Sequence, residues 1–295
     1  MEIIYIKNEN NNYQYFETLK RNRTKRHASG EFFVEGVRNI NEAFNPENGW
    51  EINSLIFSDE SNLSDWAENI IKKYKTENKN INKNKKLYVL KKDLLHKLSD
   101  KEDEESQSEI IITVKIKNNN IKDLKLNQSS SVIIFDRPSN KGNLGTIIRS
   151  CDSFDTDVLI LTGHSVDLYD SETIRASMGS FFKQKVLFEP SFNKIAQWLN
   201  EQKLIFPKMQ ITGTSAKKSK PSKILNHETF SQNLPAVIII GNETTGMSAN
   251  FYELCDNLIR IPMSENSSAS SLNVACAASI ILYEIYQQKK SRGVF

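Results

Sequence analysis

The chain has 295 residues, a formal net charge of +3 and 38% hydrophobic residues. It contains no run of about eighteen apolar residues, which argues against a membrane span, and its length predicts two domains. The start, MEIIYIKNENNNYQYF, lacks a basic stretch followed by an apolar core, so we expect a cytoplasmic protein. Cys151, Cys255 and Cys276 match neither a disulfide framework nor a zinc spacing, so we expect no metal.

Positive charge is concentrated near the N-terminus. Residues 20–27, KRNRTKRH, hold five cations and no acid, whereas residues 100–105 are strongly acidic. Blocks of this kind usually lie on a solvated surface, although a basic block can also contact phosphates. Both interpretations stay open for this segment at this point.

The N-terminal half predicts a small α/β domain. Residues 31–57 indicate a strand, a helix and a second strand, EFFVEG, VRNINEAF and INSLIF, which form a βαβ opening. Residues 72–86, rich in Lys and Asn, predict an exposed loop. A strand LYVL, a helix DLLHKL and a strand EIIITVKI follow, and the polar residues 118–131 predict a boundary. We expect domains at 1–118 and 130–295, with a linker at 119–129.

The C-terminal half repeats an apolar run, a polar turn and a helical pattern. The runs are VIIF (132–135), VLILTG (158–163), QITGTS (210–215), AVIIIG (236–241) and LIRIPM (258–263). Short β-branched runs between helices predict a parallel sheet covered on both faces, a Rossmann-like arrangement. Ligands of such sheets bind beyond the carboxyl ends of the strands, so the loops after the runs carry the expected chemistry.

The loop after VIIF, residues 136–149, combines glycines with polar side chains. Gly142 and Gly145 predict tight turning, and residues 146–154 predict a helix whose first turn carries Arg149. A glycine-rich loop before a helix is a weak signal alone, because ordinary turns share it. The spacing Gly-Asn-x-Gly-x-x-x-Arg is more selective.

Two further loops follow AVIII and LIRIPM. In the first, Gly241 permits close backbone approach, Ser248 is placed to cap a helix, and Glu243 could simply accept hydrogen bonds from loop amides. In the second, the serine-rich residues 264–270 precede Asn273, near the start of a helix through SIILYEIYQQ. A small-residue helix of this kind is commonly core or a dimer seam, but the serine-rich loop favours a polar ligand.

Taken together, three segments resemble the ordered signature blocks of the SpoU (TrmH) branch of the SPOUT methyltransferases. These are NKGNLGTIIRSCDSFDTDVLIL, IIIGNETTGMS and LIRIPMSENSSASSLNVACAASIILYE, and the resemblance spans residues 130–288. The segment IRASMGSFFKQKV is similar to the family's stretch between the first two blocks. The N-terminal LKRNRTKRHASGEFFVEGVRNINEAF resembles the family's L30e-like domain. The chain departs from the family at Thr244 and Thr245, where Gly commonly follows the Glu.

The resemblance implies a fold and an activity. It implies a Rossmann-like sheet with a deep trefoil knot, S-adenosylmethionine as cofactor, a homodimer built on the helix 273–288, and 2'-O-ribose methylation of structured RNA. An L30e-like domain favours rRNA over tRNA. A non-catalytic RNA-binding or ribosome-assembly protein is a rival, and a nucleotide-binding oxidoreductase is disfavoured because no G-x-G-x-x-G loop follows the first strand.

The resemblance also implies roles for individual residues. The residues implied to be catalytic are Arg149, Asn143, Glu243, Ser271 and Asn273. Those implied to hold the cofactor are Gly213, Thr214, Gly241, Asn242, Ile261, Met263 and Leu272. For RNA phosphates, the basic block offers Arg21, Arg23, Lys25 and Arg26.

Overall fold

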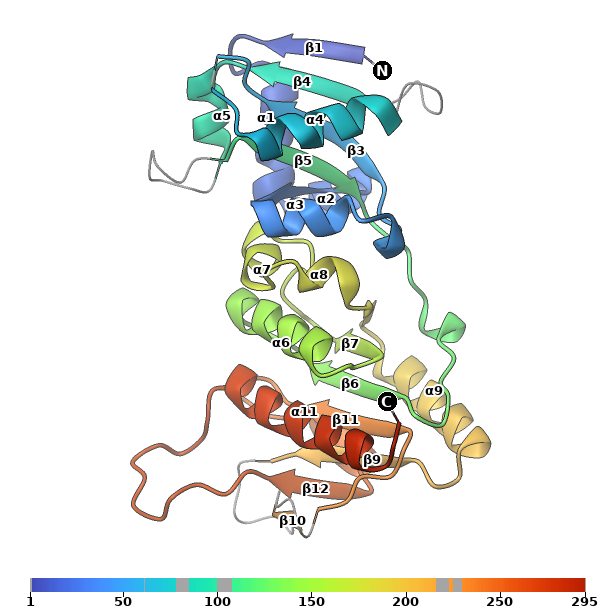
Figure 1. Cartoon of the computed structure of the whole chain (residues 1–295). Helices are drawn as coiled ribbons and strands as arrows, with labels where there is room; N and C mark the ends of the chain where they lie inside the picture. The colour runs from blue at the N-terminus through green and yellow to red at the C-terminus, as the bar shows by residue number, and fades with distance from the viewer. Residues whose placement is uncertain are drawn as a thin grey trace. The chain divides into compact units, whose positions relative to one another are not determined.

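A computed structural model describes residues 2–60, 62–77, 85–99, 108–215, 223–224 and 230–294. The chain divides into two compact units, each of which combines two stretches of sequence. Unit 1 contains Met1–Lys117 and Asp167–Phe182, and unit 2 contains Asn118–Val166 and Lys183–Phe295. The labels in Figure 1 identify their helices and strands. No helix among these described residues is long and apolar enough to cross a membrane.

Unit 1 is built on a five-stranded mixed sheet in the order β1-β4-β3-β5-β2. Strands β1, β4 and β3 are parallel, and β5 runs antiparallel to both β3 and β2. The expected βαβ opening is therefore split, because β5 lies between β2 and β3. The elements are β1 (Glu2–Ile6), α1 (Asn11–Arg21), α2 (Arg23–Ser29), β2 (Glu31–Glu35), α3 (Val37–Ala43), η1 (Pro46–Asn48), β3 (Ile52–Phe57), α4 (Asp65–Glu77), β4 (Lys86–Leu90), α5 (Lys92–Leu98), β5 (Ile110–Lys115), α7 (Ser171–Ala176) and α8 (Ser180–Lys183).

Two parts of unit 1 differ from the sequence-based expectation. Strand β1 and helix α1 were not predicted, and Asn10 starts α1 by accepting hydrogen bonds from the backbone N–H groups of Asn12 and Tyr13. The Lys/Asn tract is not wholly a loop, because α4 continues through residues 72–77, with Tyr74 buried in the core. Residues 78–84 of this tract and the acidic residues 100–107 lie outside the described part.

Unit 2 is built on a seven-stranded sheet in the order β10-β12-β9-β11-β6-β7-β8. Every neighbouring pair is parallel, which confirms the predicted α/β class. Strands β8 and β10 were not predicted. The elements are η3 (Ile121–Asp123), β6 (Ser131–Asp136), α6 (Lys141–Ser153), β7 (Val158–Thr162), β8 (Val186–Glu189), α9 (Phe192–Ile205), β9 (Gln210–Thr214), β10 (Lys223–Ile224), β11 (Ala236–Ile240), α10 (Ala249–Leu254), β12 (Asn257–Arg260) and α11 (Val274–Ser291).

Helices cover both faces of this sheet. Alternate strand residues such as Val132 and Ile134 pack in one core with Trp198 of α9 and Phe251 of α10. The intervening residues are also buried, and α6 and α11 run side by side over their face (Figure 1). Such double coverage explains why the strands read as continuous apolar runs. The knot remains a prediction from the resemblance.

Residues 118–129 behave differently from the linker that the sequence suggests. Ile121 and Leu124 are buried in the core of unit 2, and Trp198 Nε1 donates to the carbonyl of Leu124 at 3.4 Å. Most of this stretch has polar side chains, but its few apolar residues are spaced to reach that core. It is part of unit 2 rather than a free connector.

Candidate active site

The carboxyl ends of four neighbouring strands place the three predicted loops at one edge of the sheet. In the register, Ile240 of β11 pairs with Phe135 of β6, and Ile259 of β12 pairs with Thr214 of β9. Gly241 and Ile261 therefore leave the sheet at the same edge, beside Thr214. Parallel sheets bind ligands at this edge, so the loops that the sequence singles out are brought together.

The first two loops are joined through Glu243. Its carboxylate accepts hydrogen bonds from the hydroxyl of Ser139 at 2.6 Å, the backbone N–H of Ser139 at 3.0 Å and that of Asn140 at 3.2 Å. Partial burial alone would raise the pKa of Glu243, but these hydrogen bonds outweigh burial and lower the pKa below its ordinary value. Glu243 is therefore a carboxylate that fastens one loop to the other.

The first and third loops meet through two asparagines. Asn273 Nδ2 donates to Asn143 Oδ1 at 3.2 Å, and Asn273 Oδ1 caps α11 by accepting from the backbone of Ala275 and Cys276. Farther along the same helices, the hydroxyls of Ser150 and Ser279 lie 2.7 Å apart. These two links hold α6 and α11 together.

One chain of hydrogen bonds thus connects three of the predicted catalytic residues. Glu243 accepts from the backbone of Asn140, whose side chain accepts from the backbone of Asn143 at 2.8 Å, and Asn143 bonds Asn273. Arg149 is exposed on α6, and among the described residues its guanidinium has no hydrogen-bond or ion-pair partner. That leaves the cation available to an anionic ligand.

Helix α6 begins earlier than the sequence suggests. Asn140 caps it, so the helix runs from Lys141 and Arg149 lies in its third turn rather than its first. Gly142 and Gly145 are consequently helical residues and do not form the expected turn. Ser248 does occupy the position before α10, but its side chain makes no capping bond, and its backbone N–H donates to Asp136.

The residues expected at the cofactor take different roles. A Cβ at Gly241 would overlap the backbone of Gly246 and Met247, so the loop folds back tightly on this glycine. A Cβ at Gly213 would lie 2.5 Å from Met247 Cε, so close packing against Met247 explains why a glycine stands at this position. The side chain of Asn242 is used within the loops, donating to Arg137 and accepting from Thr244.

Apolar side chains stand exposed around the same loops. Met263 and Leu272 are 36% and 38% exposed, and both follow β12 in the sequence. Strand β12 ends at Arg260, so Ile261–Met263, which were predicted to belong to the strand, lie in the loop after it. Ser271 is also exposed, and its side chain has no polar partner in the described chain. Exposed apolar side chains beside backbone N–H and C=O groups suit a flat nucleobase, so these residues fit an adenosine-containing cofactor.

Four residues of the site were not predicted to act there: Asp136, Arg137, Ser139 and Asn140. A signal was present for Asn140, because an asparagine three residues before Asn143 matches a helix cap. For Asp136, an acid at the end of a fully buried strand could have been noticed. Nothing local indicates that both contact a loop more than one hundred residues away.

Known families match both units of the chain. The model of the SpoU rRNA Methylase family matches residues 130–283, which is more than half of the chain. The chain belongs to this family. The SpoU L30e-like domain matches residues 10–112. Among the residues that the structure describes, no group of three or more His, Cys, Asp or Glu side chains is placed to bind a metal ion.

Similar proteins of the SpoU family are RNA-modifying enzymes. A 23S rRNA (uridine(2479)-2'-O)-methyltransferase from Streptomyces viridochromogenes is 33% identical over 97% of this chain and 93% of its own length. The crystal structure of the SpoU methyltransferase AviRb from Streptomyces viridochromogenes, in complex with AdoMet, has a TM-score of 0.79 and 31% identity, covering 96% of this chain and 100% of that chain. A tRNA (guanosine(18)-2'-O)-methyltransferase from Aquifex aeolicus is 30% identical over 58% of this chain and 76% of its own length.

The basic block of the L30e-like unit divides into exposed and buried cations. Arg21, Arg23 and Lys25 are exposed on α1 and α2, whereas Arg26 is 1% exposed. Arg26 Nη2 lies 2.6 Å from Asp167 Oδ2 and 3.3 Å from Asp170 Oδ2.

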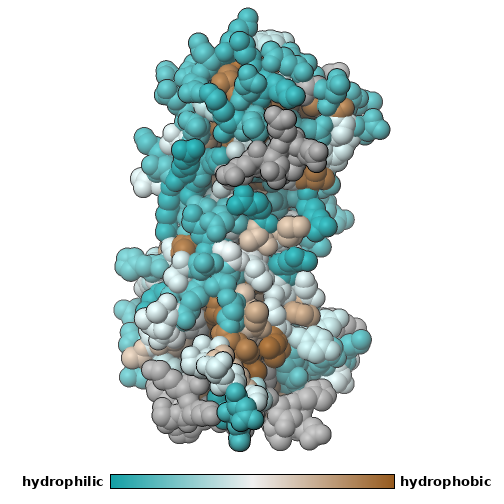
Figure 2. All heavy atoms as spheres, turned by 90° about the vertical axis from the view of Figure 1, so that its left-hand side faces the viewer, coloured by the Kyte–Doolittle hydropathy of each residue, from teal (hydrophilic) through white to brown (hydrophobic). Residues whose placement is uncertain are grey.

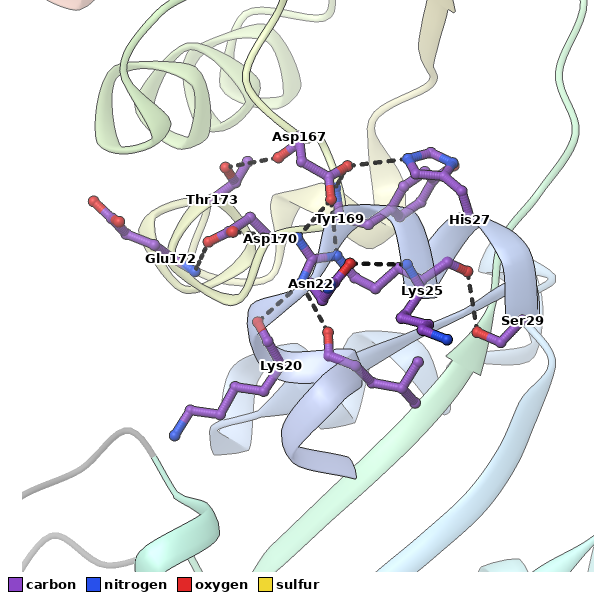
Figure 3. Close-up of polar contacts among 12 residues, drawn as sticks. Lys20, Asn22, Lys25, His27, Ser29, Asp167, Tyr169, Asp170, Glu172 and Thr173 are labelled. Carbon is purple, nitrogen blue, oxygen red and sulfur yellow. Dashed lines mark hydrogen bonds and ion pairs between the residues drawn. The ribbon is translucent and has the colours of Figure 1, made fainter. Parts of the chain in front are cut away.

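Figure 3 shows that His27 also points toward Asp167, with its Nε2 3.4 Å from Asp167 Oδ1. The prediction that Arg26 binds RNA phosphates is therefore wrong, because its guanidinium is buried and paired with carboxylates inside unit 1. Spacing along the sequence could not separate this inward-facing cation from its exposed neighbours.

Proposed function

We propose that this protein is a ribose 2'-O-methyltransferase that uses S-adenosylmethionine to methylate structured RNA, and that this RNA is rRNA. The observation that carries the proposal is the hydrogen-bonded joining of Asn143, Glu243 and Asn273, together with the exposed Arg149 on the same helix as Asn143. The relative that aligns over nearly the whole chain is a 23S rRNA 2'-O-methyltransferase. A related structure of similar extent contains AdoMet.

The cofactor would lie against the loops that leave β9, β11 and β12. The backbone of Gly241 and Ile261 and the exposed Met263 and Leu272 would hold its adenosine part, with Thr214 beside them. Gly213 and Asn242, which were also expected at the cofactor, would shape the same site through their contacts within the protein. The cofactor supplies a methyl group on a positively charged sulfur, and its loss leaves a neutral thioether.

The protein's task is then to prepare the nucleophile. A ribose 2'-hydroxyl is scarcely ionised at neutral pH, so the site must orient it and favour loss of its proton to solvent. Arg149 is a poor base, because a guanidinium keeps its proton, but it can stabilise the negative charge that develops on the oxygen. Asn143 and Asn273 would orient the ribose, and Ser271 lies close enough in sequence to Asn273 to assist.

Unit 1 would present the RNA. Arg21, Arg23 and Lys25 are exposed on one short stretch of α1 and α2, where they can contact phosphates without reading bases. The tRNA-modifying relative aligns with only 58% of the chain, whereas the rRNA-modifying relative aligns with 97%. A substrate that needs both units is thus better matched by rRNA.

We further propose that the enzyme is a cytoplasmic homodimer. Two large hydrophobic side chains of α11 are exposed: Ile280 is 42% exposed and Tyr283 is 51% exposed. Figure 2 shows apolar side chains gathered on a face of unit 2. A second copy packed against α11 would remove the side chains of Ile280 and Tyr283 from water.

Purified protein tests the activity directly. It should transfer a tritiated methyl group from S-adenosylmethionine to unmodified 23S rRNA, and the labelled nucleotide should sit in an alkali-stable dinucleotide, because a methylated 2'-oxygen cannot attack the neighbouring phosphate. The same assay on tRNA distinguishes the two substrates. If alkaline hydrolysis instead releases the label in mononucleotides, ribose methylation is ruled out.

The non-catalytic alternative is distinguished by Arg149→Ala. If Arg149 stabilises the reacting oxygen, this variant should lose most turnover and keep S-adenosylmethionine affinity in calorimetry. Wild-type protein that binds RNA but gives no heat with S-adenosylmethionine would instead support a pure binding protein.

A further inference from the structure

We propose that Asp136 and Arg137 are positioning residues that hold the loop from Gly241 to Ser248 in the shape that binds S-adenosylmethionine. The inference rests on the function proposed above. It concerns a pair of residues outside the catalytic set, at the junction between the first and second loops.

Asp136 is a buried carboxylate at the end of β6. It is 2% exposed, and Oδ2 accepts from the backbone N–H of Ser248 at 2.7 Å, while Oδ1 accepts from the hydroxyl of Thr162 at 3.1 Å. Arg137 supplies its counter-charge through Nε and Nη2, both at 3.0 Å. A buried charge needs such partners, so the carboxylate is fixed in place and fixes the end of the loop in turn.

Arg137 holds the same loop at two other points. Its Nη2 donates to the carbonyl of Gly246 at 3.1 Å, and its own carbonyl accepts from Asn242 Nδ2 at 2.6 Å. Within the loop, Asn242 and Gly246 bond each other through both backbone groups. Two consecutive residues of the first loop therefore fasten the second loop at its start and its end.

The backbone of Arg137 is strained in order to do this. Its φ is 54°, in the left-handed region that glycine adopts readily and arginine rarely. Residues with such a backbone conformation are held in it by the surrounding structure, and they are concentrated at functional sites. The side chain also packs over Gly163, where an added Cβ would lie 2.7 Å from Arg137 Cγ. An arginine here gains its three contacts at the expense of an unfavourable backbone.

This strain allows a substitution that separates the side chain from the fold. Arg137→Gly suits the backbone conformation but removes the guanidinium, while Arg137→Lys keeps a cation without the fork that reaches Asp136 and Gly246 together. Met178→Gly is the matched control, because Met178 has the same φ of 54° but belongs to unit 1.

We expect Arg137→Gly to fold, by circular dichroism and thermal melting, and to bind S-adenosylmethionine about tenfold more weakly in calorimetry, since a charge-assisted hydrogen bond is lost. Its KM for S-adenosylmethionine should rise while kcat at saturation is unchanged, which separates positioning from chemistry. Arg137→Lys should give a smaller rise, and Met178→Gly none.

Two results would overturn the inference: wild-type affinity in Arg137→Gly, or loss of fold in both Arg137 variants. Wild-type protein that fails to bind S-adenosylmethionine would instead overturn the proposed function.

Discussion

Arg26 offers the sharpest distinction between a structural cation and an RNA-binding one. Its guanidinium donates to Asp167 through Nε at 2.8 Å and to the carbonyls of Leu19 and Lys20 through Nη1 at 2.8 and 2.9 Å. The side chains of Arg26, Asp167 and Asp170 are only 2%, 6% and 11% exposed. Arg26→Met would keep the apolar stem and remove the guanidinium that contacts two buried carboxylates.

The magnitude follows from that burial. Removing one partner of a buried ion pair costs about 3–5 kcal/mol, because the remaining charge is left uncompensated. With a urea dependence of about 2 kcal/mol per molar, the unfolding midpoint of unit 1 should fall by about 2 M. Asp167 begins the stretch 167–182 that returns to unit 1 after β7, so this stretch should be released first.

Hydrogen exchange read by mass spectrometry at increasing urea reports the two units separately. Peptides from residues 167–182 should lose protection in Arg26→Met at urea concentrations where unit 2 is unaffected. Lys25→Met is the matched control, because Lys25 lies on the same helix and is exposed. If the two variants differ by less than about 0.5 kcal/mol, the ordinary range for surface changes, the structural role of Arg26 is refuted.

Three further predictions concern unit 2. Gly241→Ala should lower stability by about 1–3 kcal/mol and weaken S-adenosylmethionine binding, because the added methyl overlaps the backbone of Met247; an unaltered melting curve with and without the cofactor would contradict this. Burial would raise the pKa of Glu243, but hydrogen bonds from Ser139 outweigh burial and lower it. The ionised carboxylate therefore stabilises the fold at pH values above its ordinary pKa of 4.5, and this stabilisation is lost as the pH falls through the lower pKa of the folded state. Glu243→Gln should remove that part of the acid dependence in thermal melts, and parallel wild-type and variant curves would argue against it. If the proposed dimer is built on α11, Ile280→Glu should convert it to monomer in sedimentation velocity, whereas an unchanged sedimentation coefficient would contradict an interface on this helix.

Local patterning was sufficient for much of the architecture. The buried strands of unit 2 are continuous apolar runs because both faces of a parallel sheet are covered, so five of them could be found from sequence, and β12 was only misjudged at its end. The same rule, that ligands lie beyond the carboxyl ends of such strands, was enough to single out the loops that contain Asn143, Glu243 and Asn273. These features depend on neighbours along the chain.

Tertiary structure decided what depends on residues distant in sequence. The inward turn of Arg26 requires Asp167 and Asp170, about 140 positions away, and the clamp of Asp136 and Arg137 requires Gly246 and Ser248. A block of charges or a spacing of glycines does not reveal which of its side chains contacts a residue far away in the sequence. Burial and hydrogen bonding assign those roles, and both are properties of the folded chain.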